Sequence, residues 1–187
     1  MRVYSTHMTE TVSSRRQKPV RWRSLVLVGG LISLGVCVIL AFLLTRPARA
    51  IPIPMQVAGY PLRAHLFGPD AAREIRDMHR GTFPLTGAAI GIYGNRDATV
   101  WVSEIWGEWG AALLMHSMTK AIARVDSPFE PVGERLVDGI QVYELTGMGQ
   151  AHFYFRVRNQ VYWLAIRPTR AEAGLRDILA FAKGIGR

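Results

Sequence analysis

Twenty consecutive residues without a charged side chain, Leu25 to Leu44, constrain this chain more than any other feature. As an α-helix rising about 1.5 Å per residue, the stretch would be roughly 30 Å long, which matches the hydrocarbon core of a bilayer. This length and composition predict a transmembrane helix over residues 25–44. The chain is therefore expected to divide into a short part before the membrane and a long part after it.

Positive charge is concentrated before the apolar stretch. Residues 1–24 contain six Arg or Lys and one Glu, whereas only Arg46 and Arg49 follow the stretch closely. Because positively charged flanks stay in the cytoplasm, we expect residues 1–24 to form a basic cytoplasmic tail. The C-terminal part then lies outside the cell membrane, and the lipid bilayer is a partner of this single-pass chain.

The sequence Ala48-Arg49-Ala50 leaves a second interpretation open. Signal peptidase cleaves after small residues in this A-x-A arrangement, so cleavage at Ala50 would yield a secreted domain without an anchor. The apolar stretch is longer than the roughly 7–15 residues usual in a signal peptide, which favours a retained anchor.

The net charge of +9 belongs mostly to the N-terminal part of the chain. Residues 51–187 contain fifteen Lys or Arg and thirteen Asp or Glu, a net of only +2. They contain no cysteine, which excludes thiolate catalysis and cysteine-ligated metal there. They also lack a basic stripe with interleaved aromatic residues, so we expect no nucleic-acid partner.

A Pro-containing linker is expected at residues 45–54. Residues 55–187 then show both helical and alternating hydrophobic patterns, which predict a soluble domain of helices and strands. The helices are expected from Gly68, over residues 108–125 and from Thr169. Short strands joined by tight turns fill the rest: 88–93, 98–105, 133–137, 140–146, 151–158 and 161–166. A further short strand is expected within residues 55–66, where Gly59 and Pro61 interrupt the pattern. This order predicts an α+β extracytoplasmic domain with an antiparallel sheet of five or six strands and helices mainly on one face.

The last hairpin supplies the candidate binding surface. With Asn159-Gln160 as a two-residue turn, Arg156 would face Trp163, and alternation would gather polar and aromatic side chains on one face. That face carries His152, Tyr154, Arg156, Arg158 and Trp163. Because Tyr, Trp and Arg are enriched at interfaces, we predict that this face, directed away from the helices, binds a protein partner.

Catalytic patterns are absent from the sequence, which contains no nucleophile elbow, phosphate loop or metal-binding histidine pair. We therefore predict no cofactor or metal, and a non-catalytic binding, sensory or assembly module. The alternative is a membrane-tethered hydrolase that uses Glu104, Glu108 or His116, and it requires a deep pocket that gathers these three side chains.

Overall fold

The computed structural model describes residues 34–36, 46–79, 83–124 and 126–185. The chain divides into two compact units between residues 43 and 44, and the second unit contains all the strands. The expected basic tail lies outside the described residues, and so does the expected transmembrane segment apart from residues 34–36, which are helical. No helix in the described part of the chain has both the length and the apolar character to cross a bilayer.

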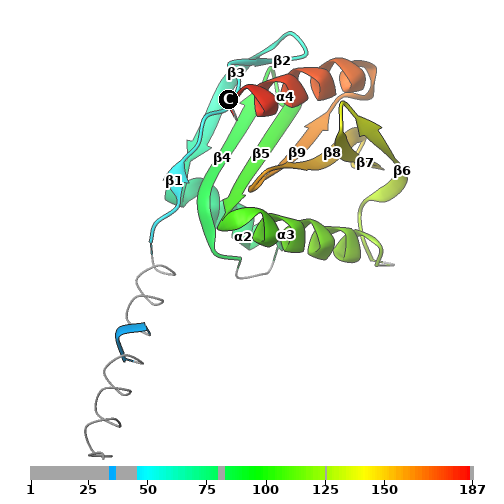
Figure 1. Cartoon of the computed structure of the whole chain (residues 1–187). Coiled ribbons are helices and arrows are strands. Elements are labelled where there is room, and N and C mark those ends of the chain that lie inside the picture. The colour runs from blue at the N-terminus through cyan, green and yellow to red at the C-terminus, as the bar shows by residue number, and fades with distance from the viewer. Residues whose placement is uncertain (1–33, 37–45, 80–82, 125, 186–187) are drawn as a thin grey trace, which may run out of the picture. The chain divides into compact units, whose positions relative to one another are not determined.

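Nine strands and three α-helices make up the described part of the second unit, with one short 3₁₀-helix before the last of them (Figure 1). In chain order they are β1 (Arg49–Ala50), β2 (Gln56–Val57), β3 (Tyr60–Phe67), α2 (Gly68–His79), β4 (Leu85–Tyr93), β5 (Ala98–Ile105), α3 (Gly107–Ile122), β6 (Glu130–Val137), β7 (Ile140–Gly147), β8 (Gln150–Val157), β9 (Gln160–Ile166), η1 (Pro168–Arg170) and α4 (Ala171–Ile185).

The strands form one curled sheet in the order β2-β3-β4-β5-β9-β8-β7-β6, with β1 beside β4 (Figure 1). All pairings are antiparallel except that of β1 with β4. The predicted α+β class and antiparallel sheet are confirmed, but the predicted five or six strands are too few. The strands β1 and β2 have two residues each, which is too short for an alternating pattern to reveal them.

Helices cover both faces of the sheet, so the prediction of helices mainly on one face is met only in part: two of the three described α-helices of this unit share a face. The helix α4 packs on one face over a core that includes Tyr93, Phe155 and Leu164. The helices α2 and α3 pack on the other face over a core that includes Ile90 and Tyr154. In the middle of β8, four consecutive residues, 152–155, are buried, as expected for a strand covered on both sides.

The packed part of the domain begins before residue 55. Ala48, Ile51 and Ile53 are buried, although they belong to the segment expected to be a linker. The strand β1 pairs with Gly87 and Ala88 of β4, so the chain joins the sheet as soon as it reaches Arg49. A stiff Ile-Pro-Ile-Pro segment buries two isoleucines here instead of spanning free space.

The last hairpin turns at Arg158-Asn159 and not at Asn159-Gln160, because Val157 pairs with Gln160. Tyr154 therefore faces Trp163, and the expected contact of Arg156 with Trp163 is replaced by pairing of Arg156 with Val161. The pairing differs from the predicted one by two residues. A shift of two keeps each side chain on its face, so the predicted division of the hairpin into two faces is confirmed.

Arg158 has a φ of +54°, in the left-handed region that costs a residue with a Cβ about 1–2 kcal/mol. We expect Arg158→Gly to raise the free energy of unfolding by about 0.5–1 kcal/mol, after the entropic cost of glycine is subtracted. Urea denaturation of the two proteins measures the difference. Arg158→Ala removes the same charge but keeps the Cβ, so a similar gain for this variant would contradict the explanation.

Candidate functional site

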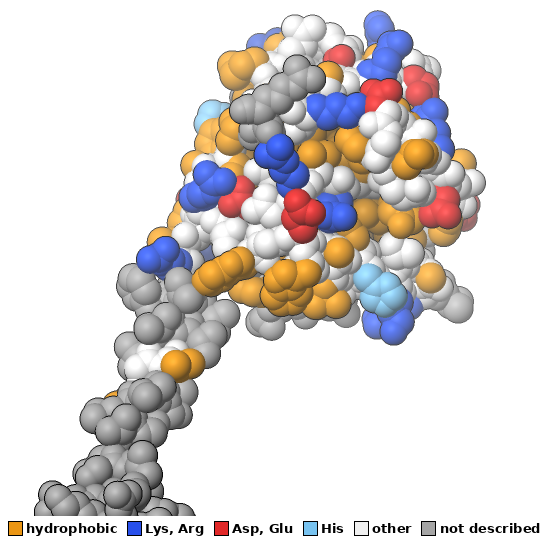
Figure 2. All heavy atoms as spheres, in the orientation of Figure 1, with side chains coloured by type: hydrophobic (Ala, Val, Ile, Leu, Met, Phe, Trp, Pro, Cys, Tyr) orange, Lys and Arg blue, Asp and Glu red, His pale blue; other side chains and the backbone are white. Residues whose placement is uncertain are grey.

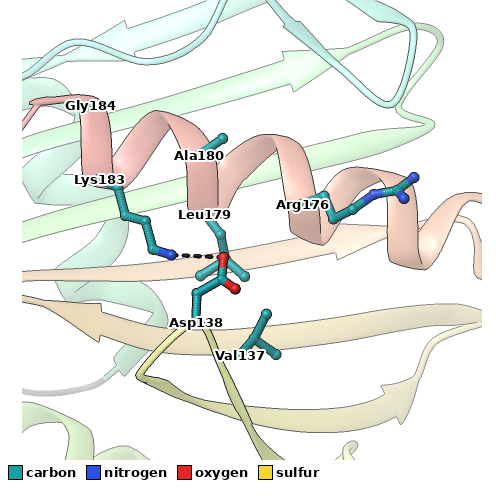
Figure 3. Close-up of a pocket in the computed structure, with 7 residues that line it drawn as sticks. All are labelled: Val137, Asp138, Arg176, Leu179, Ala180, Lys183 and Gly184. Carbon is teal, nitrogen blue, oxygen red and sulfur yellow. Dashed lines mark hydrogen bonds and ion pairs between the residues drawn. The ribbon is translucent and has the colours of Figure 1, made fainter.

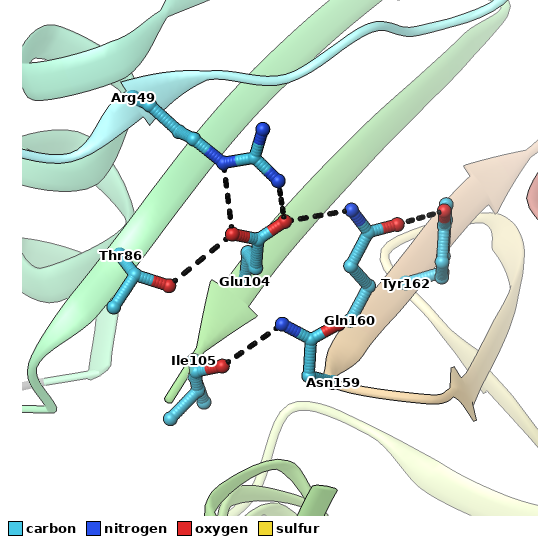
Figure 4. Close-up of polar contacts among 7 residues, drawn as sticks. All are labelled: Arg49, Thr86, Glu104, Ile105, Asn159, Gln160 and Tyr162. Carbon is cyan, nitrogen blue, oxygen red and sulfur yellow. Dashed lines mark hydrogen bonds and ion pairs between the residues drawn. The ribbon is translucent and has the colours of Figure 1, made fainter. Parts of the chain in front are cut away.

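A polar network surrounds Glu104 near the end of β5 (Figure 4). Arg49 of β1 donates from Nε and from a terminal nitrogen to the two carboxylate oxygens, at 3.0 and 2.6 Å. Gln160 of β9 donates to the same carboxylate at 3.0 Å, and the Tyr162 hydroxyl donates to Gln160 at 2.6 Å. Thr86 of β4 donates to it at 3.4 Å, so the carboxylate is held by donors from three other strands, β1, β4 and β9.

The charge of Glu104 is stabilised despite its burial. Burial alone would raise the pKa of this carboxyl, but the hydrogen bonds from Arg49 and Gln160 and the charge of Arg49 outweigh it and lower the pKa. An ionised carboxylate with its oxygens already bonded is poorly suited to take up or release a proton near neutral pH. The network attaches the first strand, β1, to the sheet, so we assign Glu104 a structural role and not a catalytic one.

Glu108 and His116 lie on the exposed surface of α3, apart from buried Glu104. Glu108 has an ion-pair partner, Arg156, at 3.7 Å. None of the three side chains lines either of the two hollows described below. The structure does not bring together the three residues that the hydrolase alternative requires.

The first hollow is a surface groove between α4 and the turn that joins β6 to β7 (Figure 3). Lys183 of α4 donates to Asp138 of the turn at 2.8 Å, and the two side chains point toward each other across the groove (Figure 3). An exposed pair of this kind contributes about 0–1 kcal/mol and leaves neither charge without a partner. The groove therefore offers little to a ligand.

The second hollow is a pocket of about 460 Å³ that opens between α2, α3 and the sheet. Its volume lies within the range of about 300–1,000 Å³ that is usual for small-molecule sites. Its wall combines apolar side chains from both helices, aromatic side chains from the sheet and a few polar groups. The residues are Ile75, Arg76, Met78, Phe83, Leu85, Trp101, Ser103, Leu114, Met118, Ala121, Ile122, Arg124, Asp126, Ser127, Pro128, Phe129, Met148, His152, Val161 and Trp163.

Aromatic rings form one wall of this pocket. Trp163 stacks on Tyr154 with ring centroids 5.4 Å apart, and Tyr154 stacks on Tyr143 at 4.7 Å. The ring of Phe129 meets those of His152 and Trp163 edge to face, at 4.9 and 5.2 Å. Such contacts are favourable beyond the area they bury, so this wall is rigid and preformed.

The helix α3 is attached to the aromatic wall by a partly buried hydrogen bond. The Thr119 hydroxyl donates to the Met115 carbonyl at 3.0 Å, so Tyr154 is the donor in its own 3.0 Å bond to Thr119. Tyr154 is therefore occupied on its ring by Trp163 and at its hydroxyl by α3. This position explains why Tyr154 is buried and does not lie on an open sheet face.

Both ring nitrogens of His152 have partners. Nε2 donates to the Gly147 carbonyl at 3.0 Å, and Nδ1 accepts from the indole of Trp163 at 3.2 Å. Burial lowers the pKa of His152, and the bond to Gly147 opposes that effect only in part. These contacts select the neutral imidazole with its proton on Nε2, and His152 acts as a structural support for the wall.

We expect the stability of the fold to decrease as the pH falls below about 6.5, the ordinary histidine pKa. Below that pH His152 is protonated in the unfolded chain but stays neutral in the folded chain, because its pKa is lowered there. The contribution is complete above that pH. Urea midpoints at about pH 7.5 and about pH 5.5 measure the effect on either side of the ordinary pKa. His152→Gln keeps a donor and an acceptor, so the decrease should be smaller in this variant. An equal decrease would assign it to other groups.

Charged side chains lie at the mouth of the pocket. Arg76 of α2 and Arg124, just after α3, line it together with Asp126 and Ser127. Neither arginine is in an ion pair among residues 46–79, 83–124 and 126–185. The mouth thus has two cations and one carboxylate, while the interior is apolar.

The five residues predicted to bind a partner separate into two groups. His152 and Trp163 line the pocket beneath α3, and Tyr154 stacks on Trp163 without lining the pocket itself. Arg156 and Arg158 lie at the end of the hairpin, where Arg156 donates to the Arg158 carbonyl at 2.9 Å. They do not form one surface directed away from the helices, because α3 covers part of that face.

Sequence patterns did not identify the pocket. Its helical side comes from Leu114, Met118 and Ile122, which the periodicity of α3 marks simply as core. Phe129 comes from a segment without a regular pattern. Within the described ranges, no group of three or more His, Cys, Asp or Glu side chains is placed to hold a metal ion.

Comparison with known proteins leaves the site to be interpreted by its own chemistry. No protein-family model, curated protein or solved structure matches the chain. The pocket and its lining residues therefore carry the functional argument.

Proposed function

We propose that this chain is a single-pass, membrane-anchored protein whose outer α+β domain is a non-catalytic binding module. The binding site is the pocket between α2, α3 and the sheet. The observation that carries the proposal is an apolar cavity of about 460 Å³ with a preformed aromatic wall. Cavities with these features are the usual sites of small-molecule binding.

The lining indicates the chemical class of the ligand. Leucine, methionine, isoleucine and aromatic side chains favour a hydrocarbon body, because they offer it few hydrogen bonds. The arginines at the mouth, Arg76 and Arg124, favour a negatively charged group at one end. An amphipathic acid of the fatty-acid type combines both properties.

Catalysis is the less supported alternative. The buried polar group of the aromatic wall, His152, is neutral and bonded at both nitrogens. The carboxylate at the mouth, Asp126, is exposed. A hydrolase site needs a base aimed at a reacting atom, and neither group supplies one.

Solvent extraction of the purified full-length chain tests the proposal. We expect mass spectrometry of the extract to show an amphipathic acid that is enriched relative to an extract of the membranes from which the protein came. An extract with the same composition as the bulk membrane lipids would contradict the proposal. Hydrolysis of a model ester that is lost in His152→Gln would support the enzyme instead.

A further inference from the structure

Two tryptophans at the start of α3 are exposed and face away from the domain core. Trp106 and Trp109 are 58% and 74% exposed, and Leu113, one helical turn further, is 51% exposed. Figure 2 shows hydrophobic side chains along the edge of the domain that α3 forms. Monomeric proteins seldom leave such large apolar side chains together in water, so this edge indicates an interaction site.

Backbone geometry at Gly107 brings the Trp109 ring back toward the turn that carries Trp106. Gly107, between them, has a φ of +73°, which a residue with a Cβ rarely adopts. A Cβ at this position would come within 3.2 Å of the Trp109 ring, so the ring lies close over the Gly107 backbone. The turn from β5 into α3 therefore presents both indoles on the same edge.

Arginines lie around these tryptophans. Ile105, just before Trp106, is hydrogen-bonded to Asn159 of the β8–β9 turn, which brings Arg158 to this edge. Arg156 pairs with Glu108, between the two tryptophans in sequence, at 3.7 Å. Arg49 reaches Glu104, two residues before Trp106. Three arginines and two carboxylates thus belong to the segments next to the two tryptophans, with a net charge of +1.

The chain joins the domain at this same edge. Arg49 is fixed in β1, and only five residues, 45–49, connect it with the end of the proposed transmembrane segment. Five residues span at most about 17 Å even when fully extended. The headgroup layer accounts for about 5–7 Å of that distance. A domain with a radius of gyration of about 14 Å must then keep the edge around Arg49 close to the bilayer.

We propose that the outer domain rests on the membrane surface through Trp106, Trp109 and Leu113, with the neighbouring arginines on the lipid phosphates. Indole rings favour the headgroup region because they combine an apolar body with a polar N–H. Arginine binds phosphate oxygens through paired N–H donors. This inference rests on the proposed anchor and is independent of what the pocket binds.

Fluorescence quenching tests the contact with lipid. The full-length chain is reconstituted into vesicles of phosphatidylcholine and phosphatidylglycerol that contain phosphatidylcholine brominated near the top of its acyl chains. We expect the brominated lipid to quench the tryptophan fluorescence strongly. In a Trp22→Phe background, which removes the tryptophan beside the proposed transmembrane segment, most of that quenching should disappear in the double variant Trp106→Phe and Trp109→Phe, which removes the two edge fluorophores and keeps the edge apolar.

Matched variants assign the quenching to its source. In Trp163→Phe the quenching should persist, because Trp163 lies in the pocket. The opposite pattern, in which Trp163→Phe abolishes the quenching and the double variant keeps it, would place lipid in the pocket and overturn the edge proposal. Protection of Trp106 and Trp109 from aqueous acrylamide without quenching by brominated lipid would also overturn it, in favour of a protein partner or a second copy. Vesicle flotation after an alkaline wash tests the anchor separately. A chain that does not float with the vesicles has no transmembrane anchor, so the proposed function fails together with the edge contact that rests on it.

Discussion

Arg49→Met is expected to lower the free energy of unfolding by about 2–3 kcal/mol, although Arg49 is a largely exposed residue. The reason is its partner: the Glu104 side chain is 6% exposed, against 66% for Arg49. The usual contribution of about 0–1 kcal/mol from a surface ion pair therefore does not apply. Without Arg49, a buried carboxylate must either stay charged with fewer donors or take up a proton.

The pH dependence gives this prediction a second measurement. In the native chain the pKa of Glu104 is lowered, so the stabilisation is complete above the ordinary glutamate pKa and is lost as the pH falls through the lowered value. In Arg49→Met the effect of burial is opposed by fewer groups, and the pKa of Glu104 should rise. Urea midpoints across the acidic range should show a smaller loss of stability in Arg49→Met than in the native chain, so the difference between the two proteins should narrow as the pH falls.

A double-mutant cycle with Glu104→Leu controls for packing. Removing both charges can be nearly neutral when the space is filled by an apolar side chain, so the double variant should recover much of the stability lost in Arg49→Met. Strictly additive effects of the two substitutions would show that the ion pair does not couple them.

The same network makes cleavage after Ala50 costly for the fold. A chain that begins at Ile51 lacks both β1 and the arginine that neutralises Glu104.

Ala121→Trp is expected to reduce the amphipathic acid that co-purifies with the chain by about tenfold, equivalent to about 1.4 kcal/mol of binding free energy. Ala121 lies in the last turn of α3, lines the pocket and is exposed. An indole at this position can occupy the mouth of the pocket without displacing the packed core. Quantitative mass spectrometry of solvent extracts, normalised to protein, measures the change.

Ala112→Trp is the matched control for this experiment. Ala112 is an exposed alanine on the same helix, but it lies outside the lining of the pocket. Its extract should resemble that of the native chain. Equal losses in the two variants, or no loss in Ala121→Trp, would show that the co-purifying molecule is bound elsewhere.

Local patterns were most informative where one short segment decides the geometry. Asp138-Gly139 predicts a tight hairpin turn, and both residues have the positive φ that such a turn requires. The spacing of Leu175, Ile178 and Leu179 predicts the buried face of the last helix, and all three are buried on α4. The expected start of that helix at Thr169 is two residues early, because Thr169 belongs to a 3₁₀ turn and α4 begins at Ala171.

The candidate site depended on contacts that no local pattern records. The same alternation that separates Tyr154 from Phe155 is compatible with an open face or with a face covered by a helix. The placement of α3 decides between them, and it buries Tyr154 and encloses the pocket. The predicted role of Glu104 likewise depended on Arg49, which lies 55 residues away in the sequence.

The sequence by itself determined the elements and their faces, because turn chemistry and the periods of helix and strand act over a few neighbouring residues. It also set the apolar segment and the charges that make a membrane anchor the leading hypothesis. Only the tertiary structure decided which faces are covered, where the pocket opens and which edge carries the exposed tryptophans. Those features arise from packing between segments far apart in the chain, and a helix or strand pattern contains no information about its partner.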